Sequence, residues 1–585
     1  MNIISILKAC INKSLICSKV NKQTIIKLSS NILEVCEHKN YGDFVTRASF
    51  YLSKLNKSNI FKIAFKININ INNKIIEKKN IVSAGYINFF ISNEYNCKML
   101  LGYTKYKNIF RYKKKTSVLI EIVSANPTGP LHVGHARGAF IGNAVSKLYK
   151  DMGYPINSEY YTNNIGKQII LLGESINKSC FNNFKNCSQD NKLPKPEDKP
   201  TYINHVIDQT PNILFPIFKS TDSNSFFVRW AIKCILIGLN NNLIDILVTL
   251  FKTNIKINTI FNESIIYQDF EAKSIIKCYN IEDIIYSKLV KPQKNEHFRE
   301  YSKACIYAYM KKGGLFLKSM LFGARNDAIL LRYNHSPVYL LADIAYHKNK
   351  INRKFSKIIN IFGADHSGHI QKLFAGLNGL NIIPHKFIFN IIVQMVNFIY
   401  NNKSVKLSKR NNNVYLFEDL AKEINPNIMR YLFLSKSTNS HLTLNIKEII
   451  SQDHEGIVQS FRYICKDIDV LRKQLVFEKQ YYKVVVKNIS ISKILTDEEH
   501  CIIKKIHFLK HILEISFLRK EPHLLLHYIE KMLNILTNIL SKYKNIQLDS
   551  RNTRTRLYII MNLISSIEKV IFNSLLILGF NPYLL

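Results

Sequence analysis

Paired cysteines, glycine, proline and tryptophan are scarce in this chain. Its 11 cysteines are scattered singly along 585 residues, and no Cys-x-x-Cys occurs. The sequence therefore offers neither a dense disulfide framework nor a cysteine-based zinc site, and this usage is typical of free thiols in a reducing compartment. Glycine (20), proline (14) and tryptophan (1) are few while Lys, Asn, Ile, Tyr and Phe are plentiful, which is the bias of an AT-rich coding sequence.

Long apolar runs are missing as well. A membrane-spanning helix needs roughly 18 or more consecutive apolar residues, and no uncharged stretch of the chain reaches that length. The most apolar segment, residues 557–580, contains Glu568 and Lys569, so we expect an amphipathic helix that packs on other helices. The sequence predicts no membrane partner.

Acidic residues are absent from the first 33 residues, and so is arginine. A segment without acids is typical of a transit peptide. The lack of arginine and the spacing of Ile4, Leu7, Ile11 and Leu15 are typical of an ordinary helix instead. Both interpretations stay open, and we favour the helix.

Negative charge is scarce overall, because 42 Asp and Glu stand against 82 Lys and Arg, which gives a formal net charge of +40. Such a chain attracts polyanions such as RNA, although part of this charge follows from the coding bias. Apolar residues at 47% and charged residues at 21% are typical of a globular protein. A chain of 585 residues is too long for one hydrophobic core, so we expect three or four domains.

The most informative segment begins with the apolar run at 118–123, which predicts a parallel strand buried on both faces. A turn rich in Pro and Gly follows, and a helix can begin at His132. A strand, a tight turn and a helix N-terminus together make an anion site, since unpaired N–H groups and the helix dipole point at the ligand. Gly134 allows close approach of the backbone, and His132 and His135 can donate hydrogen bonds to phosphate oxygens. Two plainer interpretations remain. The two histidines could be half of a metal site, although no Cys pair or second His pair has the spacing to complete it. The turn could also belong to a general nucleotide-binding domain.

The same residues carry a family resemblance. His-Val-Gly-His at 132–135 resembles the His-Ile-Gly-His signature of class I aminoacyl-tRNA synthetases. The longer string from Ser124 to Gly138, Ser-Ala-Asn-Pro-Thr-Gly-Pro-Leu-His-Val-Gly-His-Ala-Arg-Gly, resembles the arginyl-tRNA synthetase form of that signature. The resemblance implies that His132 and His135 are catalytic and that ATP is bound by Pro127, Gly129, His132, Gly134 and His135.

A second signature is Lys-Leu-Ser-Lys-Arg at 406–410, which resembles the Lys-Met-Ser-Lys-Ser loop of the same class. It implies that Lys406, Ser408 and Lys409 bind ATP and that the two lysines are catalytic. Charge builds up on the leaving pyrophosphate during adenylate formation, and mobile cations over the phosphates stabilise it. The Gly that usually follows this loop is replaced by Asn at 411–413, a residue that tolerates left-handed backbone better than most.

Carboxylates in apolar surroundings indicate the amino-acid substrate. Glu121 interrupts an apolar strand, and Asp343 lies within Leu-Leu-Ala-Asp-Ile at 340–344. A buried carboxylate is costly unless a cation pairs with it, and the cation is either a guanidinium substrate or an internal Lys or Arg. We expect both carboxylates at the C-terminal ends of parallel strands, where open α/β sheets bind ligands. The resemblance implies that arginine is held by Glu121, Ser124, Asn126, Tyr339 and Asp343. It also places two further ATP-binding residues, Asp365 and His366, near the substrates; His369 could belong with them.

The fold class expected is α/β, with a doubly wound parallel, Rossmann-like catalytic domain. Short apolar strands are predicted at 337–347, 358–366 and 387–400. The strings at 41–48 and 83–89 resemble landmarks of the N-terminal domain of arginyl-tRNA synthetases. The predicted domains are an α+β tRNA-contacting domain at 1–112, the catalytic domain at 113–436 with an insertion at about 175–310, and an all-α anticodon-binding domain at 437–585. In the last domain Pro522 can begin a helix, and Gly579 can end one.

The resemblance implies that the protein activates arginine with ATP and Mg²⁺ and transfers it to the 3′ end of tRNA(Arg). We expect no structural metal, a monomer and a bacterial-type cytoplasmic protein, with an organellar compartment left open. One rival is another class I synthetase such as the cysteinyl type, against which the Asn-Pro-Thr-Gly-Pro turn at 126–130 argues. The other is a tRNA-binding protein that has lost catalysis. Family landmarks are altered at Asn164, which replaces an Asp, and around residues 455–466, so anticodon contacts are not carried over.

Overall fold

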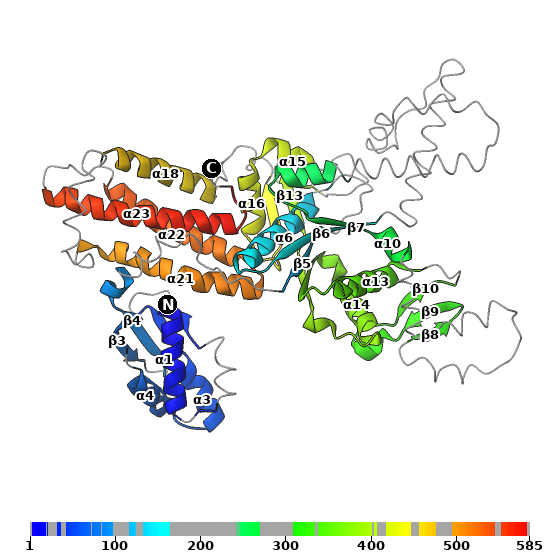
Figure 1. The fold of residues 1–585 in the computed structure, drawn as a ribbon, viewed down its shortest axis with the longest axis horizontal. Coiled ribbons are helices and arrows are strands. Elements are labelled where there is room, and N and C mark those ends of the chain that lie inside the picture. Colours follow the sequence, from blue (N-terminus) through cyan, green and yellow to red (C-terminus); the bar gives the residue numbers. More distant parts are fainter. Residues whose placement is uncertain are drawn as a thin grey trace, which may run out of the picture. The chain divides into compact units, whose positions relative to one another are not determined.

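The computed structural model describes residues 3–18, 20–21, 32–36, 42–71, 73–82, 85–97, 116–123, 131, 133–163, 243, 245–268, 308–333, 337–400, 403–405, 417–445, 456–474, 494–543 and 551–581. Contacts divide the chain into two units, which we describe separately (Figure 1). Unit 1 comprises Met1–Arg111 and Glu455–Leu585, and unit 2 comprises Tyr112–His454. The predicted turn at 124–130, His132 and the loop at 406–410 lie outside the described residues.

The N-terminal part of unit 1 is an antiparallel sheet with helices, in the strand order β1-β2-β4-β3. Its elements are α1 (Ile3–Cys17), β1 (Glu34–Val35), β2 (Phe44–Thr46), α3 (Ala48–Asn56), α4 (Ile60–Asn70), β3 (Ile76–Ile81) and β4 (Ile87–Ile91). Leu7, Ile11 and Leu15 are fully buried along one stripe of α1. The helix predicted at the N-terminus is therefore confirmed as a packed element of an α+β fold.

The C-terminal part of unit 1 is helical: α18 (Gly456–Gln474), α21 (Asp497–Arg519), α22 (Pro522–Tyr543) and α23 (Arg551–Ile577). Pro522 begins α22 as predicted, and Gly579, at a φ of +89°, follows the end of α23. Residues 556–577 are long and apolar enough to cross a membrane by length and composition, but 56% of their most apolar window is buried inside the structure. The Phe508 ring of α21 lies 4.5 Å from the Phe44 ring, and Lys504 pairs with Asp43 at 3.0 Å. The predicted first and third domains therefore fall in one unit.

The core of unit 2 is a five-stranded parallel sheet in the order β12-β11-β5-β6-β7. The strands are β5 (Val118–Val123), β6 (Ile156–Thr162), β7 (Thr259–Asn262), β11 (Lys357–Gly363) and β12 (Ile388–Val393). Every residue of β5 is buried, as the apolar run predicted. The doubly wound parallel sheet is confirmed.

Helices and two small sheets surround this core (Figure 1). The helices are α6 (Val133–Asp151), α10 (Glu263–Gln268), α13 (Tyr339–Asn352), α14 (Ser367–Gly379), α15 (Phe417–Glu423) and α16 (Pro426–Leu434), with short 3-10 turns η3 (Ser319–Phe322), η4 (Ala364–His366) and η5 (Pro384–Lys386). One small sheet has the order β10-β9-β8 and the other β14-β13-β15. Their strands are β8 (Ala308–Lys311), β9 (Gly314–Leu317), β10 (Ala328–Leu331), β13 (Val396–Tyr400), β14 (Lys403–Val405) and β15 (Leu442–Asn445).

The strand predicted at 337–347 was wrong, because residues 339–352 form helix α13. Leu340, Leu341, Ile344 and Ala345 are buried at helical spacing. Asp343 therefore lies in the first turns of a helix and not at the end of a strand. Its polar neighbours His347 and Lys350 share its face of the helix, four and seven residues further on.

Two predicted boundaries also need correction. The fifth strand of the main sheet, β7, lies inside the predicted insertion at 175–310, where it pairs with β6. Residues 442–445 were expected in the helical domain but form β15, which pairs in parallel with β13 of unit 2. Both strands have only four residues, too few for the sequence pattern to separate them from helical neighbours.

Helix α6 packs closely against the sheet at Gly142 and less closely at Gly138. A Cβ at Gly142 would lie 2.6 Å from Ile361 Cδ1 and 3.3 Å from Ile122 Cα, whereas a Cβ at Gly138 would meet only Ile361 Cγ2, at 3.6 Å. Overpacking typically costs about 1–3 kcal/mol, and Ala exceeds Gly in helix propensity by about 1 kcal/mol. We expect Gly142→Ala to lower the thermal unfolding midpoint and Gly138→Ala to keep or raise it. Equal midpoints for the two variants would contradict the close packing.

Candidate active site

The site lies where the order of the parallel strands reverses. From β5 the chain passes to β6 and β7 on one side of the sheet, and it later returns to β11 and β12 on the other side. Ligands of open α/β sheets bind at the carboxyl ends of the strands at such a reversal, here between β5 and β11. Helix α6 follows β5, and η4 follows β11, so both begin at this edge.

Four of the predicted ATP-binding residues are described. Gly134 and His135 are half-buried in the first turn of α6, and the N-terminus of a helix favours an anion. Asp365 and His366 are exposed on η4, and the His366 Nε2 lies 3.6 Å from the Asp365 Oδ2. The remaining predicted site residues lie outside the described residues: Ser124, Asn126, Pro127, Gly129, His132, Lys406, Ser408 and Lys409.

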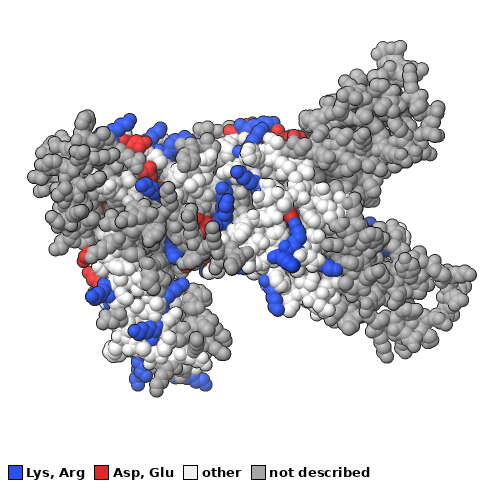
Figure 2. Space-filling model, in the orientation of Figure 1, with Lys and Arg blue, Asp and Glu red and all other residues white. Residues whose placement is uncertain are grey.

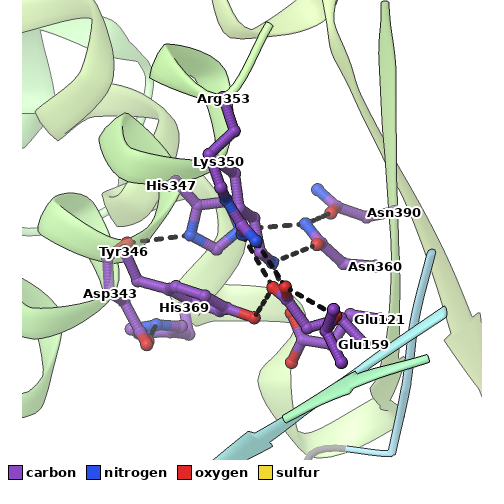
Figure 3. A network of polar contacts seen from close by, with 11 residues as sticks. Glu121, Glu159, Asp343, Tyr346, His347, Lys350, Arg353, Asn360, His369 and Asn390 are labelled. Atoms are coloured by element: carbon purple, nitrogen blue, oxygen red, sulfur yellow. Dashed lines mark hydrogen bonds and ion pairs between the residues drawn. The ribbon is translucent and has the colours of Figure 1, made fainter. Parts of the chain in front are cut away.

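Glu121 has an internal cationic partner. The Lys350 Nζ lies 2.5 Å from the Glu121 Oε2, and both side chains are almost fully buried, with exposed fractions of 0% and 3% (Figure 3). The same Nζ donates to the Asn360 Oδ1 at 2.9 Å and lies 4.0 Å from the centre of the Tyr346 ring. Of the two alternatives for this buried carboxylate, an internal lysine is therefore present; a contact of Glu121 with arginine stays a prediction.

Glu159 is a second buried carboxylate whose charge is neutralised internally, and it was not singled out from the sequence. Arg353 donates two hydrogen bonds to its oxygens, at 2.5 and 2.8 Å, and the Tyr346 hydroxyl donates a third at 2.7 Å (Figure 3). Burial alone would raise the pKa of Glu159, but the hydrogen bonds from Arg353 and the nearby charge of Lys350 outweigh it and lower the pKa below its ordinary value. Glu159 therefore stays ionised and bound within the fold.

Asp343 keeps access to solvent, since its side chain is 29% exposed. The His369 Nε2 lies 2.5 Å from its Oδ2, and the Tyr339 ring lies 4.9 Å from the His369 ring. The structure thus brings Tyr339, Asp343 and His369 together from the first turns of α13 and α14. His369 holds the carboxylate in one orientation.

A chain of polar contacts supports the helix turn of Asp343. The His347 Nδ1 donates to the Asp343 carbonyl oxygen at 2.8 Å, and the His347 Nε2 accepts from the Asn360 Nδ2 at 3.0 Å. Asn360 also donates to the Asn390 Oδ1 at 2.9 Å (Figure 3). Burial, with the charge of Lys350, lowers the pKa of His347 well below its ordinary value, so the ring is neutral and this tautomer satisfies every contact. The register pair Asn360 and Asn390 of β11 and β12 thereby anchors α13 to the sheet.

No group of three or more His, Cys, Asp or Glu side chains placed to hold a metal ion is found within the described ranges. The exposed carboxylates of the site are single groups on separate elements. Such carboxylates suit a Mg²⁺ ion that arrives with the phosphates of a nucleotide, since Mg²⁺ is usually held by one or two carboxylates together with substrate phosphates.

The parallel Rossmann-like sheet, with α6 following β5 and the strands β13 and β14 paired beside it, has the fold of a class I aminoacyl-tRNA synthetase. A family model described as "tRNA synthetases class I (R), catalytic domain" matches residues 98–450, and a model described as "Arginyl tRNA synthetase N terminal domain" matches residues 2–91. The chain belongs to the arginyl-tRNA synthetase family. The cysteinyl-type rival is thereby set aside.

Relatives and solved structures agree with this family. The arginine–tRNA ligase of Campylobacter jejuni is 31% identical over 437 residues, which cover 74% of this chain and 75% of the relative. That of Vesicomyosocius okutanii is 28% identical over 557 residues, 92% of each chain. The structure of Thermus thermophilus arginyl-tRNA synthetase covers 98% of both chains with a TM-score of 0.68 at 15% identity, which supports the fold.

Proposed function

We propose that this chain is an arginine–tRNA ligase whose chemistry takes place where β5 and β11 end. The α-carboxylate of arginine attacks the α-phosphorus of ATP, pyrophosphate leaves, and arginyl-adenylate forms. A hydroxyl of the terminal adenosine of tRNA(Arg) then attacks the carbonyl carbon, and AMP leaves. Positioning and charge stabilisation suffice for both steps, so no covalent enzyme intermediate is required.

The observation that carries the arginine assignment is the contrast among three carboxylates. Glu121 is neutralised by Lys350 and Glu159 by Arg353, whereas Asp343 has a histidine on one oxygen and keeps solvent access. A guanidinium presents a planar fork of donors that matches a carboxylate. Asp343 is therefore the group that would bind the substrate side chain, with Tyr339 beside it. Ser124 and Asn126, which follow β5 in the sequence, would contribute further contacts.

ATP would lie at the first turn of α6 with its phosphates between two sets of donors. Gly134 and His135 lie in the first turn of α6, and Asp365 and His366 lie on η4, which follows β11. Pro127, Gly129 and His132 precede them in the sequence and would bind ATP as well. Strand β14 ends at Val405, so Lys406, Ser408 and Lys409 follow it directly and would approach the pyrophosphate from the other side. Mg²⁺ would enter as part of the ATP substrate.

The segment Lys-Leu-Ser-Lys-Arg at 406–410, here called the lysine loop, supplies one prediction. Lys409→Ala should slow arginine-dependent ATP–pyrophosphate exchange by more than about tenfold, because its charge is needed mainly as pyrophosphate departs. Equilibrium arginine binding, measured by calorimetry, should change little. Lys436, a described surface lysine two residues beyond α16, serves as a charge-matched control for substitution to Ala. An unchanged exchange rate in Lys409→Ala would make the loop ordinary surface.

The net charge of +40 suits a polyanionic partner such as tRNA. A groove of about 900 Å³ in unit 1 is lined by four basic residues, Lys504, Lys505, Arg519 and Lys531, and by two acidic ones, Asp43 and Asp497. On the face drawn in Figure 2, the described Lys and Arg side chains are scattered and do not gather in one patch. Part of the net charge therefore fits the coding bias, and tRNA binding would rest on local surfaces such as this groove. We further propose that the protein acts as a monomer in a bacterial-type cytoplasm.

The proposed function is tested by ATP–pyrophosphate exchange with the full chain and single amino acids, with and without tRNA. Exchange that depends on arginine supports the proposal. Exchange with another amino acid would overturn the arginine assignment. Binding of tRNA without exchange under either condition would favour the rival function, a tRNA-binding protein without catalysis.

A further inference from the structure

Arg137 is a fully buried cation close to the predicted ATP site. It lies in α6, two residues after His135, and its exposed fraction is 0%. Its NH1 donates to the carbonyl oxygens of Gln394 and Ser440, each at 2.8 Å, and its NH2 donates to the carbonyl oxygen of Ser437 at 2.9 Å. Within the described part of the chain it has no carboxylate partner. Burial lowers its pKa to about 10, which leaves it charged at neutral pH.

The three carbonyl groups lie at the starts of two paired strands. Gln394 lies between β12 and β13, and Ser437 and Ser440 precede β15. Strands β13 and β15 pair in parallel from Val396 and Leu442 onward. The Gln394 N–H also donates to the Thr438 carbonyl oxygen at 2.9 Å, so the two segments are joined at the point that Arg137 contacts.

This point is the base of the hairpin that leads to the lysine loop. Strand β13 pairs antiparallel with β14, which ends at Val405, immediately before Lys406. The backbone of Arg137 belongs to α6, and the first turn of that helix contains His135. One side chain therefore links the helix that would bind the phosphates to the base of the strands that carry the loop.

Packing alone does not explain an arginine at this position. A buried charge without a carboxylate is costly, and a lysine would supply the same charge with a single flexible ammonium group. What arginine adds is a rigid planar fork that reaches three carbonyl oxygens in fixed directions. The residue is therefore suited to fixing geometry more than to adding stability.

We infer that Arg137 is a positioning residue for adenylate formation, which fixes the first turn of α6 relative to the starts of β13 and β15. The inference rests on the proposed function. Arg137 touches no reacting atom and acts through the backbone of the two segments. Its loss should therefore alter the ATP step and spare the arginine pocket around Asp343.

The test compares Arg137→Lys and Arg137→Met with Arg430→Lys in the full chain. Arg430 is a matched control, because it is also buried, at 1% exposure, and donates to Asn143 of the same helix and to the carbonyl oxygens of Thr253 and Asn254, which precede β7. The readouts are kcat and KM for ATP and for arginine in pyrophosphate exchange, with the thermal midpoint measured in parallel.

Both Arg137 variants are expected to lower kcat at least tenfold and to raise KM for ATP, with KM for arginine within threefold of wild type. Arg137→Lys should do so with a thermal midpoint no lower than that of Arg430→Lys, which should keep both KM values near wild type. Three outcomes would overturn the inference. They are a wild-type kcat in the Arg137 variants, KM values for ATP and arginine that rise in parallel, and failure of both variants to fold. A wild-type chain without arginine-dependent exchange would instead contradict the proposed function.

Discussion

Asp343→Asn is expected to raise KM for arginine by about 30-fold to several thousand-fold and to leave KM for ATP within a few-fold of wild type. The substitution keeps the size and hydrogen-bonding capacity of the side chain but removes the charge that would pair with the guanidinium. Losing one partner of a desolvated charge pair typically costs about 2–5 kcal/mol. The measurement is arginine-dependent pyrophosphate exchange with each substrate varied in turn.

Asp365→Asn is the matched control for this variant, since its carboxylate belongs to the same edge but is 69% exposed and is assigned to ATP. It should change the ATP parameters and not those of arginine. Wild type should discriminate strongly against lysine, because a compact ammonium group cannot use the forked geometry. A wild-type KM for arginine in Asp343→Asn, or equal activation of lysine and arginine by wild type, would contradict the arginine-binding role. Asp343 would then be only the ion-pair partner of His369.

Lys350→Met is expected to lower the free energy of unfolding by about 3–5 kcal/mol, because it leaves Glu121 charged and buried without its cation. Glu121→Gln combined with Lys350→Met should recover most of that loss, since neither member of the pair is then left charged. Urea unfolding of the two single variants and the double variant gives the coupling energy of the pair.

A loss below about 1 kcal/mol for Lys350→Met, the range of exposed pairs, would mean that Glu121 does not depend on Lys350. Glu121 would then be available to arginine, as the family resemblance implies. A large coupling energy would instead assign Glu121 to the fold, where it holds α13 on β5.

The parts of the fold that could be predicted from sequence have long or unambiguous patterns. The apolar run at 118–123 predicted a fully buried strand, and Pro522 predicted the start of α22. The run at 337–347 was misassigned because its apolar residues are nearly contiguous. The polar residues at 343, 347 and 350 carried the helical period, and counting them would have corrected the assignment.

The partners within the site could not be predicted, because they depend on assembly of the sheet. Lys350 and Glu121 are separated by 229 positions along the chain, and Arg353 and Glu159 by 194. A lone carboxylate in an apolar strand indicates that a cation is near, but it does not distinguish an internal lysine from a substrate. Arg137 gave a similar signal, a cation among the small and apolar residues of α6, and its meaning emerged only from the carbonyl groups around it.

The most direct test of the central claim is charging of tRNA(Arg) by the purified full chain with ATP, Mg²⁺ and labelled arginine, with Asp343→Asn measured beside it. The account predicts that wild type forms arginyl-tRNA and does not form lysyl-tRNA at equal amino-acid concentration. It also predicts that Asp343→Asn, at subsaturating arginine, charges at least about 30-fold more slowly, in line with loss of one partner of a desolvated pair. Absence of arginyl-tRNA with wild type, or equal rates for wild type and Asp343→Asn, would contradict the account.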